Sequence, residues 1–332
     1  MSDPVAALPL GARVVVRARL SPQRVADLGG PSMTDAVGTL VAVDATSLVV
    51  ETSRGRVTIE RERVVAAKVV PPKPARRGAP HLALSIESLQ RVMVDGWPPL
   101  VQEPLGDWLL RAAGGFTRRA NSVMTSGDPG LPVSAALDHM ERWYAARGLP
   151  PLASLAGPRG FRTTDDGVGA ELVARGYTPQ VRTLVMTAAS AALADAPGTA
   201  GHPVTLSDSL EPSWLAAYAR QREPVPEVTE RVLSGSPAQV FACVPAADGS
   251  VAAIARLSIA HAWGGLSCLW VDPAHRRRGL AQALTAALGA EARGRGIRSV
   301  WLQAEEENTA ALALYRGMGF STHHAYEYLV RS

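Results

Sequence analysis

The sequence has little that would support a secreted or membrane-spanning protein. Its 332 residues include only two cysteines, Cys243 and Cys268, whose spacing matches no metal-ligand motif. The apolar runs are short and interrupted by Arg, Asp, Gly or Pro, so none reaches the ~20 residues of a membrane helix. The first ten residues contain Asp3 and no basic cluster, unlike a signal peptide. We therefore expect a cytoplasmic protein with reduced thiols, no membrane partner and no metal.

Positive charge is in excess only near the N-terminus. Residues 1–80 hold 12 Lys and Arg against 7 Asp and Glu, whereas residues 81–332 hold 22 against 23. An excess of five charges over 80 residues is typical of an ordinary protein surface, and it does not by itself predict a nucleic-acid partner.

The first part of the chain, residues 1–70, has the pattern of a small all-β domain. Short Val-rich runs are separated by turn signals, and several alternate, with Val57 and Ile59 on one face and Thr58 and Glu60 on the other. We expect strands at residues 11–20, 36–44, 47–52, 55–60 and 64–70. Five short strands favour a closed barrel, and this part resembles an SH3-like barrel. Residues 71–80, with four prolines and three basic residues, predict a stiff linker.

The rest of the chain alternates helices and strands in two stretches, residues 81–190 and 203–332. We expect a strand at residues 118–124 and a helix at 132–147 in the first stretch. In the second we expect a helix beginning at Pro226, three strands, and then helix, strand, helix and strand. The helix at residues 135–148 matches that at residues 283–296, about 148 positions later. The pattern predicts a mixed α/β fold that is duplicated.

The most informative segment is residues 269–281, Leu-Trp-Val-Asp-Pro-Ala-His-Arg-Arg-Arg-Gly-Leu-Ala. An apolar strand ends at Val271, and a basic loop leads into an Ala- and Leu-rich helix. The first turn of a helix has unpaired amides and a partial positive charge, which suits a pyrophosphate. Gly279 and Ala281 leave room for phosphate oxygens to approach the backbone.

This segment resembles the Arg/Gln-x-x-Gly-x-Gly/Ala pattern of the GNAT superfamily, the general-control-related N-acetyltransferases, with Arg276, Gly279 and Ala281 at its fixed positions. The resemblance implies that acetyl-CoA lies between two splayed parallel strands that end at Val271 and Gln303. It also implies a fold, a mixed-sheet α/β GNAT domain at the C-terminus. The cofactor-binding residues it implies are Leu269, Trp270, Val271, Arg276, Arg277, Arg278, Gly279, Leu280, Ala281, Asn308 and Tyr315.

A second motif, residues 303–320, looks like the strand–Asn–helix–Tyr–Gly–Phe signature of the same superfamily. Asn308 and Tyr315 are seven residues apart, about two helical turns, and so share one face. The resemblance implies that Asn308 binds the coenzyme and that Tyr315 is the general acid that protonates the departing thiolate. It implies direct attack of a neutral amine on the thioester.

The general base stays open at this point. Many relatives have a carboxylate on the strand before the loop, but residues 264–271 contain none. Water, Glu305 or His261 could take the proton, and we assign Glu305 as the candidate. Residues 305–307 are all glutamate, which also suits a helix N-terminus electrostatically. We expect Cys268 to be a buried structural thiol and give His275 no catalytic role.

The middle part has no comparable loop. At the matching place, residues 126–132, Asp128 would repel phosphate and the prolines remove amide donors. We expect residues 81–190 to be a degenerate GNAT-like unit without coenzyme binding. Arg118 and Arg119 can be structural or can contact substrate. The whole order resembles actinobacterial GNAT proteins with an N-terminal SH3-like barrel.

These features predict an acetyl-CoA-dependent N-acetyltransferase whose acceptor is the amine of a small molecule or a protein. The alternative is a non-catalytic acetyl-CoA sensor or docking module, which the basic barrel would deliver to protein or nucleic acid.

Overall fold

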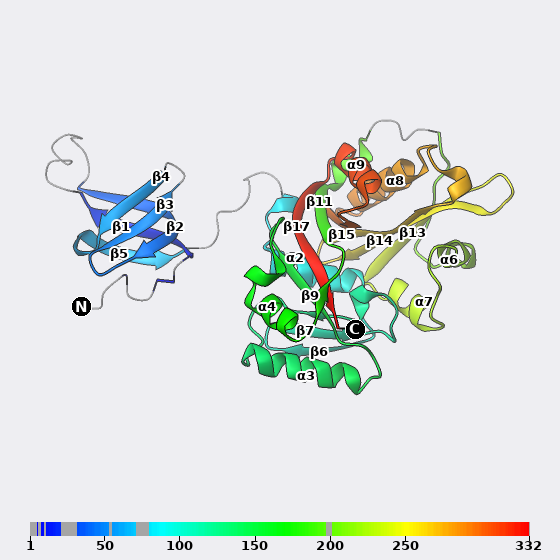
Figure 1. Ribbon diagram of the computed structural model, residues 1–332. Coiled ribbons are helices and arrows are strands. Elements are labelled where there is room, and N and C mark those ends of the chain that lie inside the picture. Colours follow the sequence, from blue (N-terminus) through cyan, green and yellow to red (C-terminus); the bar gives the residue numbers. More distant parts are fainter. Residues whose placement is uncertain are drawn as a thin grey trace. The chain divides into compact units, whose positions relative to one another are not determined.

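The computed structural model describes residues 5, 8–9, 11–20, 32–52, 55–70, 80–196 and 201–331. The chain divides into two compact units, Met1–Ala75 and Arg76–Ser332 (Figure 1). Of the expected linker at residues 71–80, all but Pro80 lies outside the described residues.

The N-terminal unit is a five-stranded antiparallel sheet, as expected from its alternating pattern. Val14, Val16, Leu48 and Val50 alternate with more exposed residues and are fully buried. The strands pair in the order β4-β3-β2-β1-β5. The elements are β1 (Arg13–Arg19), β2 (Met33–Val43), β3 (Ser47–Thr52), β4 (Gly55–Glu60), η1 (Arg61–Arg63) and β5 (Val64–Val69).

The C-terminal unit contains two successive sets of elements. The first set is η2 (Pro80–Leu82), α2 (Ile86–Gly96), β6 (Val101–Leu105), β7 (Trp108–Ala112), η3 (Arg118–Ala120), β8 (Val123–Met124), α3 (Val133–Ala145), β9 (Leu152–Gly157), η4 (Thr163–Asp165), α4 (Gly167–Ala174), β10 (Thr178–Pro179), β11 (Thr183–Ala189) and α5 (Ser190–Ala194). The second set is β12 (Thr205–Ser207), α6 (Pro212–Ala219), α7 (Val228–Leu233), β13 (Ala238–Pro245), β14 (Val251–Ala260), β15 (Trp263–Val271), η5 (Pro273–His275), α8 (Leu280–Gly294), β16 (Ser299–Glu305), α9 (Thr309–Gly317) and β17 (Ser321–Val330).

The two sets share one sheet and exchange their last strands. The strand order is β12-β13-β14-β15-β16-β11-β17-β9-β8-β7-β6, with β10 paired to β17. Strand β11 of the first set therefore lies between β16 and β17 of the second. Strand β17 in turn lies between β11 and β9 of the first set, and Figure 1 shows β11 beside β17. Each half completes the other, and the predicted mixed α/β architecture is confirmed.

The halves also follow the same local order. In each, a long helix connects two parallel strands, α3 between β8 and β9 and α8 between β15 and β16. A shorter helix follows in both halves, α4 in the first and α9 in the second. The repeat of this order agrees with the helix-to-helix offset in the sequence.

Some local predictions were wrong. Residues 118–124 form η3 and the two-residue β8 rather than one strand. The reason is Asn121, whose side-chain amide bonds the amides of Ala113 and Gly115 and the carbonyls of Phe116 and Thr117. These bonds stabilise a loop in place of a ladder. The helix expected from Pro226 begins later, at Val228.

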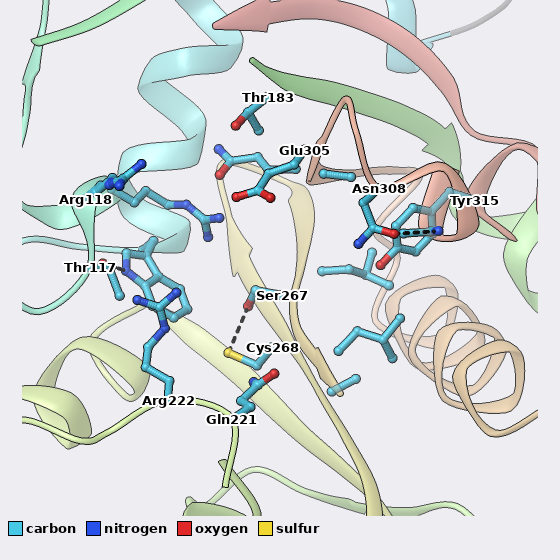
Figure 2. A pocket seen from close by; sticks show the side chains of 18 of the residues that line it. Thr117, Arg118, Thr183, Gln221, Arg222, Ser267, Cys268, Glu305, Asn308 and Tyr315 are labelled. Atoms are coloured by element: carbon cyan, nitrogen blue, oxygen red, sulfur yellow. Dashed lines mark hydrogen bonds between the residues drawn. The ribbon is translucent and has the colours of Figure 1, made fainter. Parts of the chain in front are cut away.

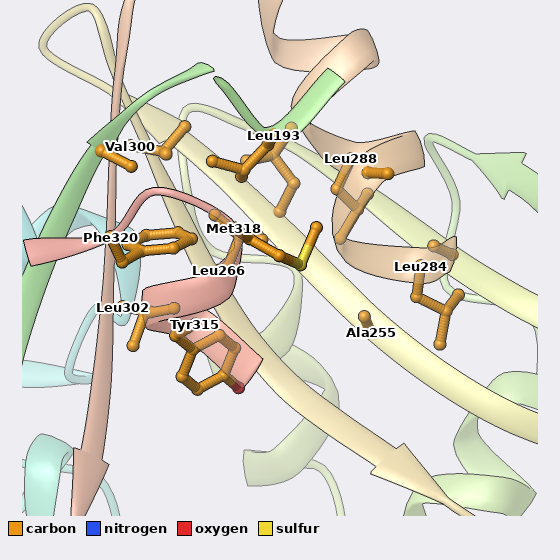
Figure 3. Packing of buried hydrophobic residues seen from close by; sticks show 14 of the residues in the cluster. Leu193, Ala255, Leu266, Leu284, Leu288, Val300, Leu302, Tyr315, Met318 and Phe320 are labelled. Atoms are coloured by element: carbon orange, nitrogen blue, oxygen red, sulfur yellow. The ribbon is translucent and has the colours of Figure 1, made fainter. Parts of the chain in front are cut away.

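The main core lies between the sheet and helices α5, α8 and α9. Leu193, Leu284 and Leu288 meet Val300 of β16 and Met318 in this core (Figure 3). Helix α8 approaches α5 closely because Gly289 has no side chain, and a Cβ atom there would lie 2.3 Å from Leu193 Cβ. This packing fixes the start of α8 relative to the sheet.

Candidate functional site

The two central parallel strands separate halfway along their length. Strands β15 and β16 pair only from Trp263–Ser299 to Leu266–Leu302, although β15 continues to Val271 and β16 to Glu305. The register of β14 against β15 shifts at the same point. Cys268 there has φ of 56°, a left-handed conformation that is rare for a residue with a side chain. The bulge turns the end of β15 away from β16 and opens the sheet.

A pocket of about 610 Å³ occupies this opening. It is lined by Leu266, Ser267, Cys268 and Leu269 of β15 and by Gln303 and Glu305 of β16. Asn308, Ala311 and Tyr315 from α9 and Thr285 from α8 also line it. Figure 2 shows Tyr315 and Asn308 on the side of α9, with Glu305 near the centre. The segments that carry both sequence motifs therefore meet at one cavity.

The opposite wall comes largely from outside the motifs. Trp97, Thr117, Arg118 and Arg119 of the first half line it, with Gln221 and Arg222 after α6 (Figure 2). Of the two interpretations of Arg118 and Arg119, a position facing the cavity fits substrate contact. Sequence reasoning missed Trp97, Gln221 and Arg222, since neither periodicity nor a motif distinguishes them from surface or core residues.

Tyr315 is almost buried and faces the cavity from the second turn of α9. Its ring packs edge-on against Phe320, with the centroids 5.7 Å apart, and the residue is 9% exposed. Burial raises the pKa of its phenol to about 12, because the charged phenolate is poorly solvated there. The hydroxyl is thus protonated at neutral pH.

Asn308 and Glu305 flank the start of α9. The Asn308 side-chain oxygen accepts a hydrogen bond from the amide of Ala311 at 3.1 Å, so Asn308 is the N-cap of this helix. Glu305 is exposed and lines the pocket, whereas Glu306 and Glu307 do not line it. The carboxylate of residue 305 is the only one among the described residues that form the pocket wall.

The basic loop lies directly before α8. Asp272 accepts a hydrogen bond from the Ala274 amide at 2.9 Å, and Arg276 Nε donates to the Val271 carbonyl at 3.3 Å. The N-cap is Gly279, with φ of 82° and no side-chain cap. The first intrahelical bond runs from Ala283 N to Gly279 O, so the helix presents the amides before it, such as those of Leu280 and Ala281, at its end.

Arg277 and Arg278 of the same loop are exposed and do not line the pocket. Arg277 has φ of 63°, and Arg278 donates to the Ala274 carbonyl at 3.2 Å. Trp270 stacks under the Arg220 guanidinium, 4.7 Å from the ring centroid. The predicted cofactor residues thus form two sets. The loop set is residues 276–281, outside the pocket wall, and the pocket set is Leu269, Asn308 and Tyr315. Trp270 and Val271 at the end of β15 lie between the two sets in the chain.

Of two further residues considered from the sequence, Cys268 lines the pocket and His261 does not. His261 lies in the β14–β15 turn, bonded to Asp95 at 2.5 Å, and does not line the pocket. Cys268 does line it, but burial raises the pKa of its thiol, and its Sγ donates a hydrogen bond to Ser267 Oγ at 3.9 Å (Figure 2). Burial of this kind suits an inert thiol.

Across the described ranges, no cluster of three or more His, Cys, Asp or Glu residues could hold a metal ion. No helix in the same ranges is both long and apolar enough to cross a membrane.

Comparison with known proteins identifies both units. Residues 8–68 match the Rv0428c N-terminal Sm-like domain, which agrees with the expected small all-β domain and describes it as Sm-like. Residues 84–329 match the family described as probable histone acetyltransferase Rv0428c C-terminal.

Individual relatives agree. The chain is 29% identical over 257 residues to the uncharacterized N-acetyltransferase YobR of Bacillus subtilis, covering 74% of this chain and 98% of that protein. It is 29% identical over 337 residues to the probable histone acetyltransferase Rv0428c of Mycobacterium tuberculosis, covering 96% and 95%. A GCN5-related N-acetyltransferase from Kribbella flavida shares the fold, with TM-score 0.56 and 18% identity over 75% of this chain and 96% of that one.

The family match covers far more than half of the chain, and it includes both halves of the shared sheet. The chain therefore belongs to the family of the Rv0428c C-terminal region, and it is an acetyltransferase of the GNAT type.

Proposed function

We propose that this chain transfers the acetyl group of acetyl-CoA to a primary amine by direct attack, with Tyr315 as general acid. The observation that supports this most strongly is the cavity between β15 and β16, which opens beside the Tyr315 phenol. GNAT acetyltransferases use acetyl-CoA, and such a gap admits a thin pantetheine arm between two strands.

The basic loop and the start of α8 suit the diphosphate. Arg276, Arg277 and Arg278 are exposed and can reach an anion, and the helix end adds amides and a partial positive charge. Gly279 is exposed, and a Cβ atom placed on it would meet only His202 Nε2, at 3.6 Å. In this proposal Asn308 holds the coenzyme with the part of its amide that does not cap α9.

The acetyl carbonyl would lie against the end of β15, where the amides of Leu269, Trp270 and Val271 can stabilise the oxyanion. The amine nitrogen attacks the carbonyl carbon and forms the C–N bond. The C–S bond then breaks, and the thiolate takes a proton from Tyr315. The nitrogen loses a proton in the same sequence, which leaves an amide and free coenzyme A. The high pKa of Tyr315 keeps its proton available for this step.

Glu305 is the proposed acceptor of the amine proton, directly or through water. It is the carboxylate on the described pocket wall, whereas His261 is bonded to Asp95 outside that wall. In this scheme residues 203–332 are the catalytic domain, and residues 81–190 are a GNAT-like unit that has lost coenzyme binding. Cytoplasmic acceptors, with the amine on a small molecule or on a protein, fit this scheme.

The test is thiol release from acetyl-CoA with a panel of primary amines. Tyr315→Phe should lower kcat by about 100-fold or more, in the range of general acid catalysis, without changing the affinity for acetyl-CoA. Tyr177→Phe is the matched control, since it removes another buried phenol outside the pocket. Equal rates for wild type and Tyr315→Phe would remove Tyr315 from the mechanism.

A further inference from the structure

One side of the pocket is strongly basic. Arg118, Arg119 and Arg222 line the wall opposite α9, and the only carboxylate on the described wall is Glu305. Figure 2 shows Arg118 and Arg222 on the side away from Tyr315 and Asn308. The cavity thus has a positively charged side across from Tyr315 and Asn308.

These guanidinium groups are not neutralised by carboxylates. Among the described residues, Arg118, Arg119 and Arg222 have no ion pair with Asp or Glu, although surface arginines elsewhere pair often, as Arg295 does with Asp208 and Glu291. Arg119 is half-buried, and its Nε atom is buried with no hydrogen-bond partner in the same part of the chain. A buried charged donor without a partner is costly unless something else binds it.

The platform beneath Arg119 is rigid. Its guanidinium lies 5.1 Å from the centroid of Trp97, whose Nε1 donates to Thr117 Oγ1 at 2.9 Å. Thr117 itself has φ of 60°, held by the hydrogen bonds of Asn121 to the same loop. A position so constrained suits recognition of a ligand better than a mobile surface side chain does.

A fourth arginine, Arg256, adds to the positive electrostatic potential near this wall. Arg256 of β14 is fully buried, and its guanidinium bonds the carbonyls of Leu233 and Gly96 and the hydroxyl of Ser236. Burial lowers its pKa to about 10, so it stays charged at neutral pH. These partners are neutral, so its charge is not cancelled locally.

The phosphates of the coenzyme do not account for this wall. The donors suited to them, Arg276 to Arg278 and the start of α8, belong to the loop set outside the pocket wall. The basic wall instead faces the side from which an acceptor would approach the thioester, across from Tyr315.

Resting on the proposed function, we infer that the acceptor is an amine that also carries an anionic group, such as the carboxylate of an amino acid. The anionic group binds Arg119 with Arg118 and Arg222, and the amine lies near Glu305. Arginine forks suit carboxylates through paired, charge-assisted hydrogen bonds. The same charges repel a lysine-rich protein tail, which would bring many cations to this wall.

The experiment compares acceptors with and without a carboxylate. Thiol release would be measured with phenylalanine against phenylalaninamide and phenethylamine, with lysine against cadaverine, and with a lysine-rich peptide. We expect the carboxylated acceptors to have a kcat/KM at least about tenfold higher, as for a partly buried charge pair. Arg119→Met and Arg222→Met should remove that preference, so that the ratio of kcat/KM for phenylalanine over phenethylamine falls towards one. Arg159→Met, an exposed arginine outside the pocket wall, is the control.

A second measurement does not depend on turnover. Calorimetry on the wild-type protein saturated with coenzyme A should detect binding of N-acetylphenylalanine and weak or no binding of N-acetylphenylalaninamide. The Arg119→Met variant should bind neither compound. Preference for cadaverine, phenethylamine or the lysine-rich peptide would overturn the inference and leave the proposed acetyl transfer intact. Failure of every amine to release thiol would contradict the proposed function, and the calorimetric comparison would still decide whether the arginine wall binds anions.

Discussion

The long helices α8 and α3 have corresponding places in the two halves, but they begin differently. Helix α8 follows three arginines and has Gly279 as its N-cap, in a left-handed conformation with no side chain over the helix end. Helix α3 has Pro132 as its N-cap, which has no amide hydrogen to offer. Similar backbone architecture therefore begins with a basic loop and a glycine in one half and with a proline in the other.

The loop before α3 uses its polar groups internally. Asp107 accepts a hydrogen bond from the Asp128 amide at 3.0 Å, and Asp128 accepts one from the Gly130 amide at 2.8 Å. Trp108 Nε1 donates to the Gly127 carbonyl at 3.2 Å. The first half therefore has a closed acidic turn where the second half has a basic loop, and its Trp97 and Arg119 line the pocket that the second half opens. If the proposed function holds, the second half binds the coenzyme and the first half contributes to acceptor recognition.

The largest effect is expected from separating the halves. Residues 203–332 alone lack β11, which pairs with both β16 and β17, so two buried strands gain open edges. We expect this fragment to aggregate or to lack cooperative unfolding, whereas residues 76–332 should unfold cooperatively. Circular dichroism during urea titration, with size-exclusion chromatography, measures this. A monomeric 203–332 fragment with a sharp transition would show that the exchange of strands is dispensable.

The exchange itself could not be foreseen from the sequence. The pattern of Thr183–Ala189 identifies a buried strand, and its location in the sheet depends on pairing with residues more than 100 positions away. The strand that ends at Val271 and the helix after Gly279 were predicted closely, because turn chemistry and apolar periodicity are local. Local signals fixed the elements, and long-range packing fixed their order.

The same distinction applies to the site. Tyr315 and Glu305 belong to a motif with fixed spacing, so their convergence at one cavity follows from a short stretch of chain. Trp97 and Arg222 reach that cavity only because α2 and the segment after α6 pack near β14 and β15. Residues that tertiary packing brings to a cavity carry no local sequence signal. For this reason the sequence did not predict Trp97 and Arg222 as part of the pocket.

The next largest effect is expected at the helix end that distinguishes the halves. Gly279→Glu places a carboxylate where the diphosphate is proposed to bind and should weaken acetyl-CoA binding by at least about 100-fold, through steric overlap and repulsion. Gly130→Glu is a close control, because Gly130 is also exposed, has a positive φ of 72°, and lies just before α3. Calorimetry should show unchanged affinity for the control, and equal affinities for both variants would place the diphosphate elsewhere.

The smallest effect concerns the seam between the exchanged strands, where β11 contributes no titratable residue and β17 contributes a buried histidine. His324 pairs with Val185 of β11, is fully buried, and bonds Gln90 and His323 at 2.8 Å each. Burial, with the adjacent His323, lowers the pKa of His324 to about 3, so the neutral ring is the form that the fold accepts. The neutral ring's contribution to the free energy of unfolding is fully present above the unfolded pKa of about 6.5 and is lost as the pH falls towards 3. The loss amounts to about 2 kcal/mol at pH 5.

Urea unfolding of wild type and His324→Gln at pH 7.5 and pH 5 separates this effect from that of the carboxylates, which titrate in both proteins. The free energy of unfolding should fall more steeply with acid in wild type, and identical pH dependence would mean that this histidine does not couple the seam to protons.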